Sequence, residues 1–241
     1  MTSFHTAVDI GAFAIVAGAF FVAFIYPPLS MRKATRQSCI ALARAVEARE
    51  PFLLGHSELT AHYAVAMAKQ SLRLWPWQVR DLEVASLLHL VGKVGVPHAI
   101  LNSAYPLDRA DQFSVREYVR IGAQIIHAVP LLSAASRTVQ FHREYLDGSG
   151  HPFGRYGDGV PFSSRILCVA TEYVSMTRPR LYRGTERAMT HEEALAHFLD
   201  YSGTRYDPEV IELLARAVRP SRMGIVARFL KVPGNAVTAA D

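Results

Sequence analysis

Hydrophobic residues recur with helical spacing from about Lys33 to about Val218. One run has apolar side chains at the relative positions i, i+4, i+7 and i+8, which are Leu59, Tyr63, Ala66 and Met67. An earlier run ends before a proline and consists of Ala41, Leu42, Ala45, Val46 and Ala48. No stretch of the sequence alternates apolar and polar residues as a half-buried strand does. The pattern predicts an all-α domain over residues 32–218.

Capping residues mark where several of these helices are expected to begin. Three pairs predict a helix start: Ser114 with Glu117, Thr190 with Glu193, and Asp207 with Pro208. The first two have the S/T-x-x-E form of a capping box, and the third puts proline at the first helical position. Glycine occurs at positions 148, 150, 154, 157 and 159. We therefore expect residues 147–161 to form an irregular loop between two helices.

The amino terminus has a different pattern, because residues 10–26 contain no charged side chain. These 17 residues would form about 26 Å of helix, close to the hydrocarbon thickness of about 30 Å. No Lys or Arg precedes the segment, whereas Arg32, Lys33 and Arg36 follow it. This asymmetry predicts one transmembrane helix in the cytoplasmic (inner) membrane, with the rest of the chain in the cytoplasm. The alternative is a hydrophobic helix buried in the soluble domain.

Composition adds a preference for anionic partners. Half of the residues are hydrophobic, the formal charge is +5 and the isoelectric point is about 9.4. Nucleotides or lipid headgroups suit such a chain, but the charge is spread out, so no nucleic-acid partner is expected. Cys39 and Cys168 are far apart and are expected to be reduced thiols. The basic tail, residues 219–241, either lies on anionic lipid as an amphipathic helix or packs against the domain.

A continuous apolar run from Val84 to Leu88 predicts a helix that is covered on most sides. We expect this helix to end where Gly92 adopts the left-handed conformation common at helix C-termini. His89 would then lie in the last buried turn. A lone histidine at such a position is more often a core residue than a metal ligand, so the assignment depends on the residues around it.

Short motifs around His89 and farther along the chain occur in one order over about residues 40–215. They include Gly55-His56-Ser57, His89, the segment from Gly92 to Pro97, Ile121-Gly122-Ala123, His142, Asp147-Gly148-Ser149-Gly150, Arg165-Ile166-Leu167 and Tyr206-Asp207-Pro208. In this order the motifs resemble the HD-GYP subgroup of the HD phosphohydrolases, which are bacterial phosphodiesterases of cyclic di-GMP. The resemblance implies an HD-domain helical bundle, here preceded by one transmembrane helix.

The resemblance also implies metal-dependent hydrolysis of a phosphodiester at a cluster of two or three ions. Three residues fall on metal-ligand positions of the family: His56, His89 and His142. Glu47 lies near the region that supplies a carboxylate in some members. Lys93 matches a lysine that contacts the scissile phosphate, and Arg183 matches an arginine near the nucleotide phosphates.

Other ligand positions of the family carry different residues in this chain. Leu90 and Thr171 replace aspartates, and Tyr118 and Arg143 replace histidines. A bridging aspartate neutralises two close cations and fixes their spacing, which neither leucine nor threonine can do. We therefore predict vestigial histidines, no cofactor and no catalysis. The alternative is one divalent ion, Fe, Mn or Zn, held by the three remaining imidazoles.

The replacements suggest a binding site instead. Arg143 directly follows His142, and its guanidinium suits a phosphate group. We expect four residues to bind cyclic di-GMP or another nucleotide: Lys93, Arg143, His151 and Arg183. His151 occupies the position of the family's tyrosine and keeps an aromatic ring that can form hydrogen bonds. In the alternative, Arg143 turns outward or pairs with Glu144, Asp147 or Glu172.

These inferences predict three segments: a membrane anchor at residues 1–31, an HD-GYP-like domain at 32–218 and a basic tail at 219–241. The expected function is that of a membrane-anchored, catalytically inactive signalling domain. It would act as a nucleotide receptor or as an interaction module, with signalling proteins and membrane lipid as partners. The alternative function is a metal-dependent cyclic di-GMP phosphodiesterase with a reduced metal site.

Overall fold

The computed structural model describes residues 19, 26–103, 105–178 and 187–218. The chain divides into two compact units, Met1–Ala41 and Leu42–Asp241. Nearly all of the predicted membrane segment, the predicted ligand residue Arg183 and the basic tail lie outside the described residues.

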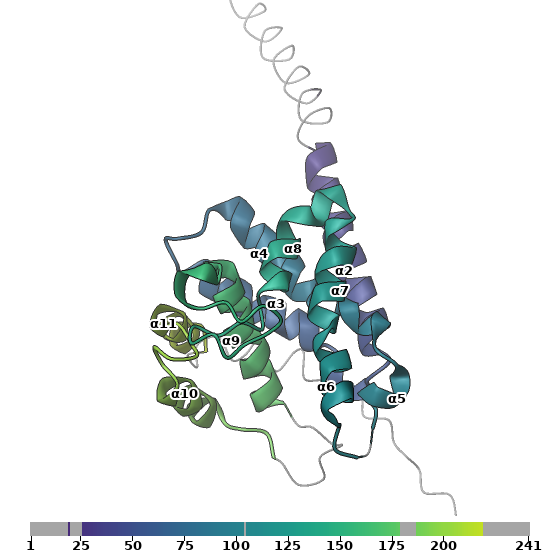
Figure 1. Ribbon diagram of the computed structural model, residues 1–241. Helices are drawn as coiled ribbons and strands as arrows, with labels where there is room; N and C mark the ends of the chain where they lie inside the picture. The colour runs from purple at the N-terminus through teal and green to yellow at the C-terminus, as the bar shows by residue number, and fades with distance from the viewer. Residues whose placement is uncertain (1–18, 20–25, 104, 179–186, 219–241) are drawn as a thin grey trace, which may run out of the picture. The chain divides into compact units, whose positions relative to one another are not determined.

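The described residues form helices and connecting turns, with no strand among them (Figure 1). The α-helices are α2 (Tyr26–Glu47), α3 (His56–Ala68), α4 (Pro76–Leu88), α5 (His98–Leu101), α6 (Arg109–Arg116), α7 (Tyr118–His127), α8 (Ser133–Gln140), α9 (Phe162–Thr177), α10 (His191–Asp200) and α11 (Pro208–Ala217). Short 3-10 helices are η2 (Pro51–Leu53), η3 (Val91–Gly95), η4 (Pro130–Leu132) and η5 (Gly157–Gly159). The predicted all-α architecture is confirmed.

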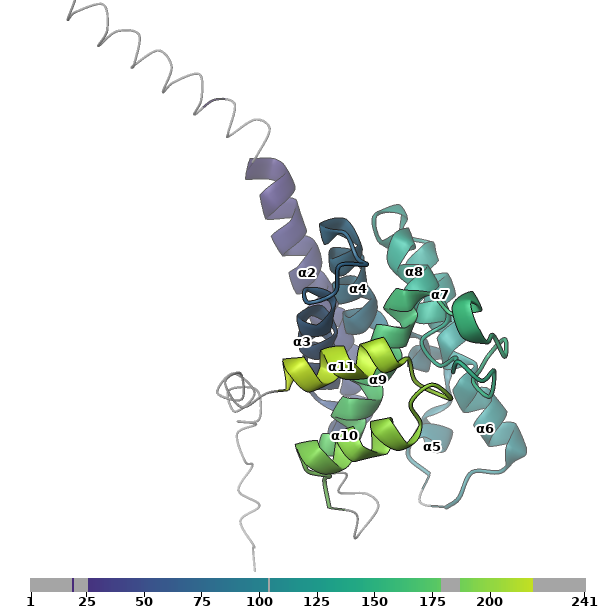
Figure 2. The ribbon, with the colours of Figure 1, turned by 90° about the vertical axis from the view of Figure 1, so that its left-hand side faces the viewer.

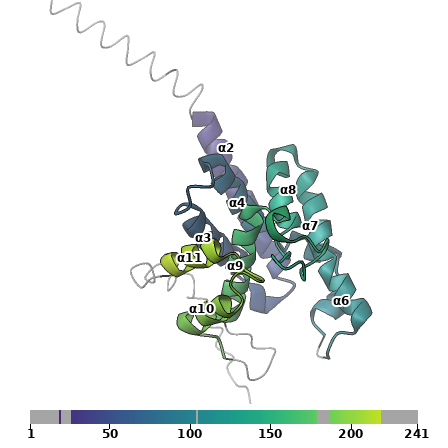
Figure 3. The same cartoon turned by 60° about the vertical axis from the view of Figure 1, so that its left-hand side comes forward.

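Helix α9 lies between two groups of helices in the larger unit (Figures 2 and 3). It contacts α3 and α4 on one side and α8 on another, while α10 and α11 pack against its remaining surface. The stripe predicted on α3 is buried, with Leu59, Tyr63, Ala66 and Met67 each at most 9% exposed. Tyr63 meets Tyr173 of α9 edge-on, with ring centroids 4.8 Å apart. Close packing of aromatic and aliphatic side chains therefore holds α3 against the central helix.

Two of the predicted helix starts are confirmed and one is wrong. Thr190 and Glu193 form the expected capping box, and the Asp207 carboxylate accepts a hydrogen bond from Glu209 N with Pro208 at the first helical position. Ser114 instead lies inside α6, because Asp108 caps this helix by accepting from Asp111 N. Aspartate is as good an N-cap as serine, so the upstream aspartate defines the start.

The prediction that Gly92 ends the helix in a left-handed conformation is wrong. Gly92 does not adopt the left-handed conformation, and α4 already ends at Leu88 with His89 as its C-cap. A Cβ atom at position 92 would lie 1.9 Å from the carbonyl oxygen of Tyr118 and 2.4 Å from Gly122 N. Glycine is needed because η3 and α7 approach each other backbone to backbone.

In the described part of the chain, no single helix is long and apolar enough to cross a membrane. Among the described helices, one pair, Arg109–His127 and Pro130–Gln140, meets that requirement together, with a bend of 118° between its two members.

Candidate ligand site at the histidine cluster

The structure brings the three predicted metal-position histidines together in the interior. His56 begins α3, His89 directly follows α4 and His142 lies just after α8. Their exposed fractions are 4%, 0% and 0%. The ring centroids of His56 and His89 are 5.5 Å apart, as are those of His89 and His142. The packing of α3, α4 and α8 in one bundle therefore creates a cluster of imidazoles.

Backbone carbonyls fix the tautomers of two of these rings. His89 Nδ1 lies 2.7 Å from the Ser86 carbonyl, and His142 Nδ1 lies 2.6 Å from the Val139 carbonyl. A carbonyl only accepts, so both Nδ1 atoms carry the proton and both Nε2 atoms present a lone pair. His89 Nε2 is buried and has no hydrogen-bond partner among the described residues. An imidazole oriented in this way by a backbone carbonyl is typical of a metal ligand.

Burial keeps the cluster neutral. It lowers the pKa of His89 to about 3, although the bond to Ser86 acts in the opposite direction. Burial also holds the pKa values of His56 and His142 well below the ordinary range, and the nearby Arg143 lowers them further. All three rings are therefore uncharged bases at neutral pH.

Tyr118 and Arg143 occupy the space beside His142. The Tyr118 hydroxyl lies 3.1 Å from His142 Nε2, to which it donates because that nitrogen is unprotonated. Arg143 Nε donates to the same hydroxyl at 2.9 Å. The lone pair of His142 is thus taken up by a tyrosine that is itself held by a guanidinium.

Arg143 is fixed from its other side by α9. Its NH1 atom lies 3.7 Å from Glu172 Oε1. Although burial opposes the charged form, Tyr118 and Glu172 raise the pKa of Arg143 above its ordinary value. Glu172 also accepts from the hydroxyl groups of Tyr145 and Tyr206. Both sequence alternatives for Arg143 therefore occur at once, because it borders the histidine cluster and pairs with Glu172.

Lys93 is held by a partner that the sequence did not indicate. Its Nζ atom donates to both carboxylate oxygens of Glu50, at 2.7 and 2.8 Å. Neighbouring Arg49 donates to the carbonyls of Lys93 and Val96, at 2.6 and 2.8 Å. The lysine predicted to contact a phosphate thus belongs to an ion pair that joins η3 to the turn between α2 and η2.

Glu47, the other carboxylate considered from the sequence, supports the start of α3. Its two oxygens accept from Gly55 N and Ser57 N, each at 2.7 Å. Burial raises the pKa of Glu47, although these backbone bonds lower it. A carboxylate used in this way orients His56 by fixing the residues on both sides of it.

The remaining predicted residue, His151, lies next to Arg143. A Cβ at Gly150 would be 2.5 Å from the Arg143 carbonyl oxygen, and this close approach allows His151 N to donate to that carbonyl at 2.9 Å. Burial lowers the pKa of His151 to about 4, with Arg143 and Arg116 acting in the same direction. Its Nδ1 atom has no partner among the described residues.

The side chains at the replaced aspartate positions offer no charged donor. Leu90 is buried, and the Thr171 hydroxyl donates to the Leu167 carbonyl at 2.7 Å. Within residues 26–103, 105–178 and 187–218, no three His, Cys, Asp or Glu side chains are arranged as a set that could hold a metal ion. Individual imidazoles are therefore oriented as metal ligands, but the residues present do not fit a cluster of two ions.

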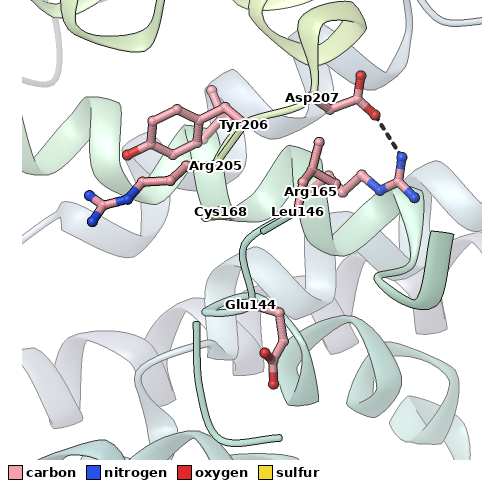
Figure 4. Close-up of a pocket in the computed structure, with 8 residues that line it drawn as sticks. Glu144, Leu146, Arg165, Cys168, Arg205, Tyr206 and Asp207 are labelled. Atoms are coloured by element: carbon pink, nitrogen blue, oxygen red, sulfur yellow. Dashed lines mark hydrogen bonds and ion pairs between the residues drawn. The ribbon is translucent and has the colours of Figure 1, made fainter. Parts of the chain in front are cut away.

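A small pocket beside the loop of residues 147–161 has a structural role that the sequence did not indicate (Figure 4). Arg165 and Asp207 point toward each other across its wall, with NH1 and Oδ2 2.8 Å apart. Arg165 also donates to the Val160 and Gly157 carbonyls, and Glu144 accepts from the backbone of Phe153 and Arg155. These buried charges fix the loop that carries His151.

The sequence profile of the family described as an HD domain matches residues 41–210, which is more than half of the chain. The chain belongs to the HD domain family. A curated relative is the 3'3'-cGAMP-specific phosphodiesterase 3 of Vibrio cholerae serotype O1, which is 33% identical over 183 residues, or 74% of this chain and 38% of the relative. Another relative is the cyclic di-GMP phosphodiesterase response regulator RpfG of Xanthomonas campestris pv. campestris. It is 30% identical to this HD domain, and the match covers 75% of this chain and 47% of RpfG.

Solved structures show the same fold. A crystal structure of a cyclic GMP-AMP specific phosphodiesterase of V. cholerae matches with a TM-score of 0.60 and 19% identity, over 83% of this chain and 54% of that one. Bd1817 of Bdellovibrio bacteriovorus, described as an HDG"Y"P protein, matches with a TM-score of 0.51 and 16% identity, over 67% and 50%. The HD-GYP resemblance is confirmed, and the chain spans about half the length or less of the relatives it matches.

Proposed function

We propose that this HD domain is a receptor that binds a cyclic dinucleotide through Arg143 and does not cut it. The observation that carries the proposal is the guanidinium beside the histidine cluster, held by Tyr118 and Glu172. Its side chain is 24% exposed, so it borders both the buried imidazoles and the solvent. A guanidinium has five N–H donors in a planar fork, which suits a phosphate group. Curated relatives of the chain are named as phosphodiesterases of cyclic dinucleotides, and this supports a cyclic dinucleotide as the ligand.

The chemistry of the donor set supports binding without hydrolysis. Cleavage in the family depends on ions that generate hydroxide and clamp the phosphodiester, and a pair of close ions needs a bridging anion. Leu90 and Thr171 offer none. At an effective dielectric constant of about 20, two unit charges about 4 Å apart interact by about 4 kcal/mol, so a divalent ion beside Arg143 would be opposed by about twice that amount.

A metal-dependent cyclic dinucleotide phosphodiesterase with a reduced metal site is the second candidate. The comparisons favour this hydrolase over the receptor, because the curated relatives described above are named as phosphodiesterases. The Nε2 atom of His89 favours it as well, since it has no partner among the residues that the structure describes and its lone pair is oriented as a ligand. For this function His56, His89 and His142 would have to turn toward one Fe, Mn or Zn ion, because among the described residues they are not arranged as a set that could hold one. Such an ion would supply an activated water.

We also propose that residues 10–26 anchor the chain in the cytoplasmic membrane, with the HD domain in the cytoplasm. The absence of charge in that segment and the basic residues after it support this topology. Signalling proteins are the expected partners of such a tethered receptor.

One pair of assays with the full chain separates the two functions. Calorimetry with cyclic di-GMP and with cyclic GMP-AMP, in the presence of a chelator, should show binding that is lost in Arg143→Ala. Arg137→Ala is the matched control, because Arg137 is exposed on α8 only a few residues earlier. Incubation with Mn, Fe or Zn should yield no linear dinucleotide. Metal-dependent product would establish the hydrolase, and unchanged binding by Arg143→Ala would contradict the receptor site.

A further inference from the structure

The turn between α3 and α4 and the first residues of α4 take no part in the histidine cluster (Figure 1). Large apolar side chains are exposed there. Leu72 is 104% exposed, Trp75 64% and Trp77 55%. The two indole rings stack on each other, with centroids 5.2 Å apart and an angle of 6° between their planes. Exposure of this much apolar surface at one turn is typical of an interaction site.

The turn is held in a defined shape rather than folded back on the domain. Ser71 Oγ accepts from Arg73 N at 3.1 Å, and the Gln78 side chain accepts from Trp75 N at 2.9 Å. Arg73 connects the turn to the starts of α9 and α11, because its guanidinium lies 4.2 Å from the centre of the Phe162 ring and its NH1 atom 3.0 Å from Glu209. The leucine and the indoles are therefore presented outward by a fixed backbone.

Charge indicates what this turn contacts. Residues 69–80 contain Lys69, Arg73 and Arg80 and no acidic side chain. Asp81 follows directly and lies 3.8 Å from the Arg80 guanidinium, whose side chain is still 50% exposed. Lys69 and Arg80 are exposed on either side of the apolar tip. Tryptophan and basic side chains together are typical of segments that lie at the boundary between lipid headgroups and acyl chains. Exposed leucine adds apolar surface that only a nonpolar environment would cover.

We propose that the turn carrying Leu72 and Trp75, together with Trp77 in the first turn of α4, inserts into the headgroup region of an anionic lipid bilayer. The indoles and the leucine enter the interface, and Lys69 and Arg80 contact the lipid phosphates. This contact orients the domain on a membrane surface, and it does not depend on nucleotide binding at the histidine cluster.

The chain is well suited to a direct test, because Trp75 and Trp77 are its only two tryptophans. Their intrinsic fluorescence therefore reports on this turn alone. The full chain is reconstituted with vesicles of phosphatidylcholine, with or without phosphatidylglycerol, and with matching lipids brominated on the upper acyl chain. We expect a shift of emission to shorter wavelength and quenching by the brominated lipid, stronger with phosphatidylglycerol and weaker at high salt.

Variants separate insertion of the turn from attachment by another part of the chain. Leu72→Ser, and Lys69→Glu combined with Arg80→Glu, should reduce the quenching by brominated lipid. Phe113→Ser is the matched control, because Phe113 is 66% exposed on α6 and should leave the quenching unchanged. Emission identical with and without vesicles would overturn the proposal. A shift that depends on protein concentration and not on lipid would overturn it as well, because the patch would then contact a second copy.

Discussion

The Tyr118 hydroxyl donates to the unprotonated Nε2 atom of His142 across 3.1 Å. The same oxygen accepts from Arg143 Nε, so one hydroxyl joins the imidazole cluster to the guanidinium. His142 is fully buried, and the Arg143 side chain is 24% exposed. The hydroxyl is therefore needed to satisfy two polar groups at once.

Replacing Tyr118 by Phe should destabilise the domain by about 1–3 kcal/mol, because the buried His142 acceptor and the partly buried Arg143 donor each lose a partner. Urea unfolding of the full chain measures this loss. Tyr105→Phe is the control, since Tyr105 is 81% exposed and its substitution should change the free energy of unfolding by less than about 0.5 kcal/mol. Equal unfolding free energies for the two variants would show that the hydrogen bonds of the Tyr118 hydroxyl contribute nothing to stability.

Replacing Gly92 by Ala should also be strongly destabilising. The new methyl group would lie 1.9 Å from the Tyr118 carbonyl oxygen, and a backbone atom cannot move aside as a flexible side chain can. We expect a loss of about 3 kcal/mol, at the upper end of the range for overpacking. Thermal unfolding measures it against Gly159→Ala, where the nearest atom to the added Cβ is 4.0 Å away. Similar stability of both variants would mean that η3 and α7 can separate without cost.

The elements of the fold followed from local patterns, whereas several partners in the site did not. Helical periodicity predicted α3 and its buried face, because each turn repeats the same spacing. The pairing of Lys93 with Glu50 joins residues 43 positions apart, and no local pattern encodes it. Gly92 was misinterpreted for the same reason, since the contact that requires glycine comes from α7.

The histidine cluster was predicted only through the resemblance to a known family. Spacing along the chain does not place His56, His89 and His142 near one another, but the order of the family motifs does. The sequence did not predict that one carboxylate, Glu172, contacts Arg143, Tyr145 and Tyr206, because these contacts depend on how α9 packs. Glu172 was named only as one alternative partner of Arg143.

The carboxylate of Glu193 should titrate below its ordinary pKa of 4.5, because Arg187 and the backbone N–H of Thr190 stabilise its charged form. A depressed pKa in the folded state means that the contribution to stability is present above 4.5 and is lost as the pH falls through the folded-state value. Carboxyl NMR titration measures the pKa directly. Arg187→Ala should raise it toward 4.5, and an unchanged value would exclude the ion pair as the main cause.

Residues 10–26 are expected to cross the membrane once, with the carboxyl end of the chain in the cytoplasm. The basic residues after the segment, Arg32, Lys33 and Arg36, set this orientation. A reporter enzyme that is active only outside the cytoplasm, fused after Asp241, should remain inactive. A fusion of the same reporter before Met1 should be active. An active fusion after Asp241 and an inactive one before Met1 would show the reverse topology.

Restoring one carboxylate at the histidine cluster should not restore hydrolysis. Leu90→Asp places a bridging side chain next to His89, but Thr171 still supplies no second carboxylate, and Tyr118 and Arg143 still occupy the space beside His142. A pair of ions requires its bridge and its terminal ligands together, so we expect no linear dinucleotide from the single variant with added manganese or iron. The comparison is the combined variant Leu90→Asp, Tyr118→His, Arg143→His and Thr171→Asp, which should bind more metal per chain than Leu90→Asp alone. Product formation by Leu90→Asp would contradict this prediction, and product formation by the unaltered chain as well would establish the hydrolase alternative.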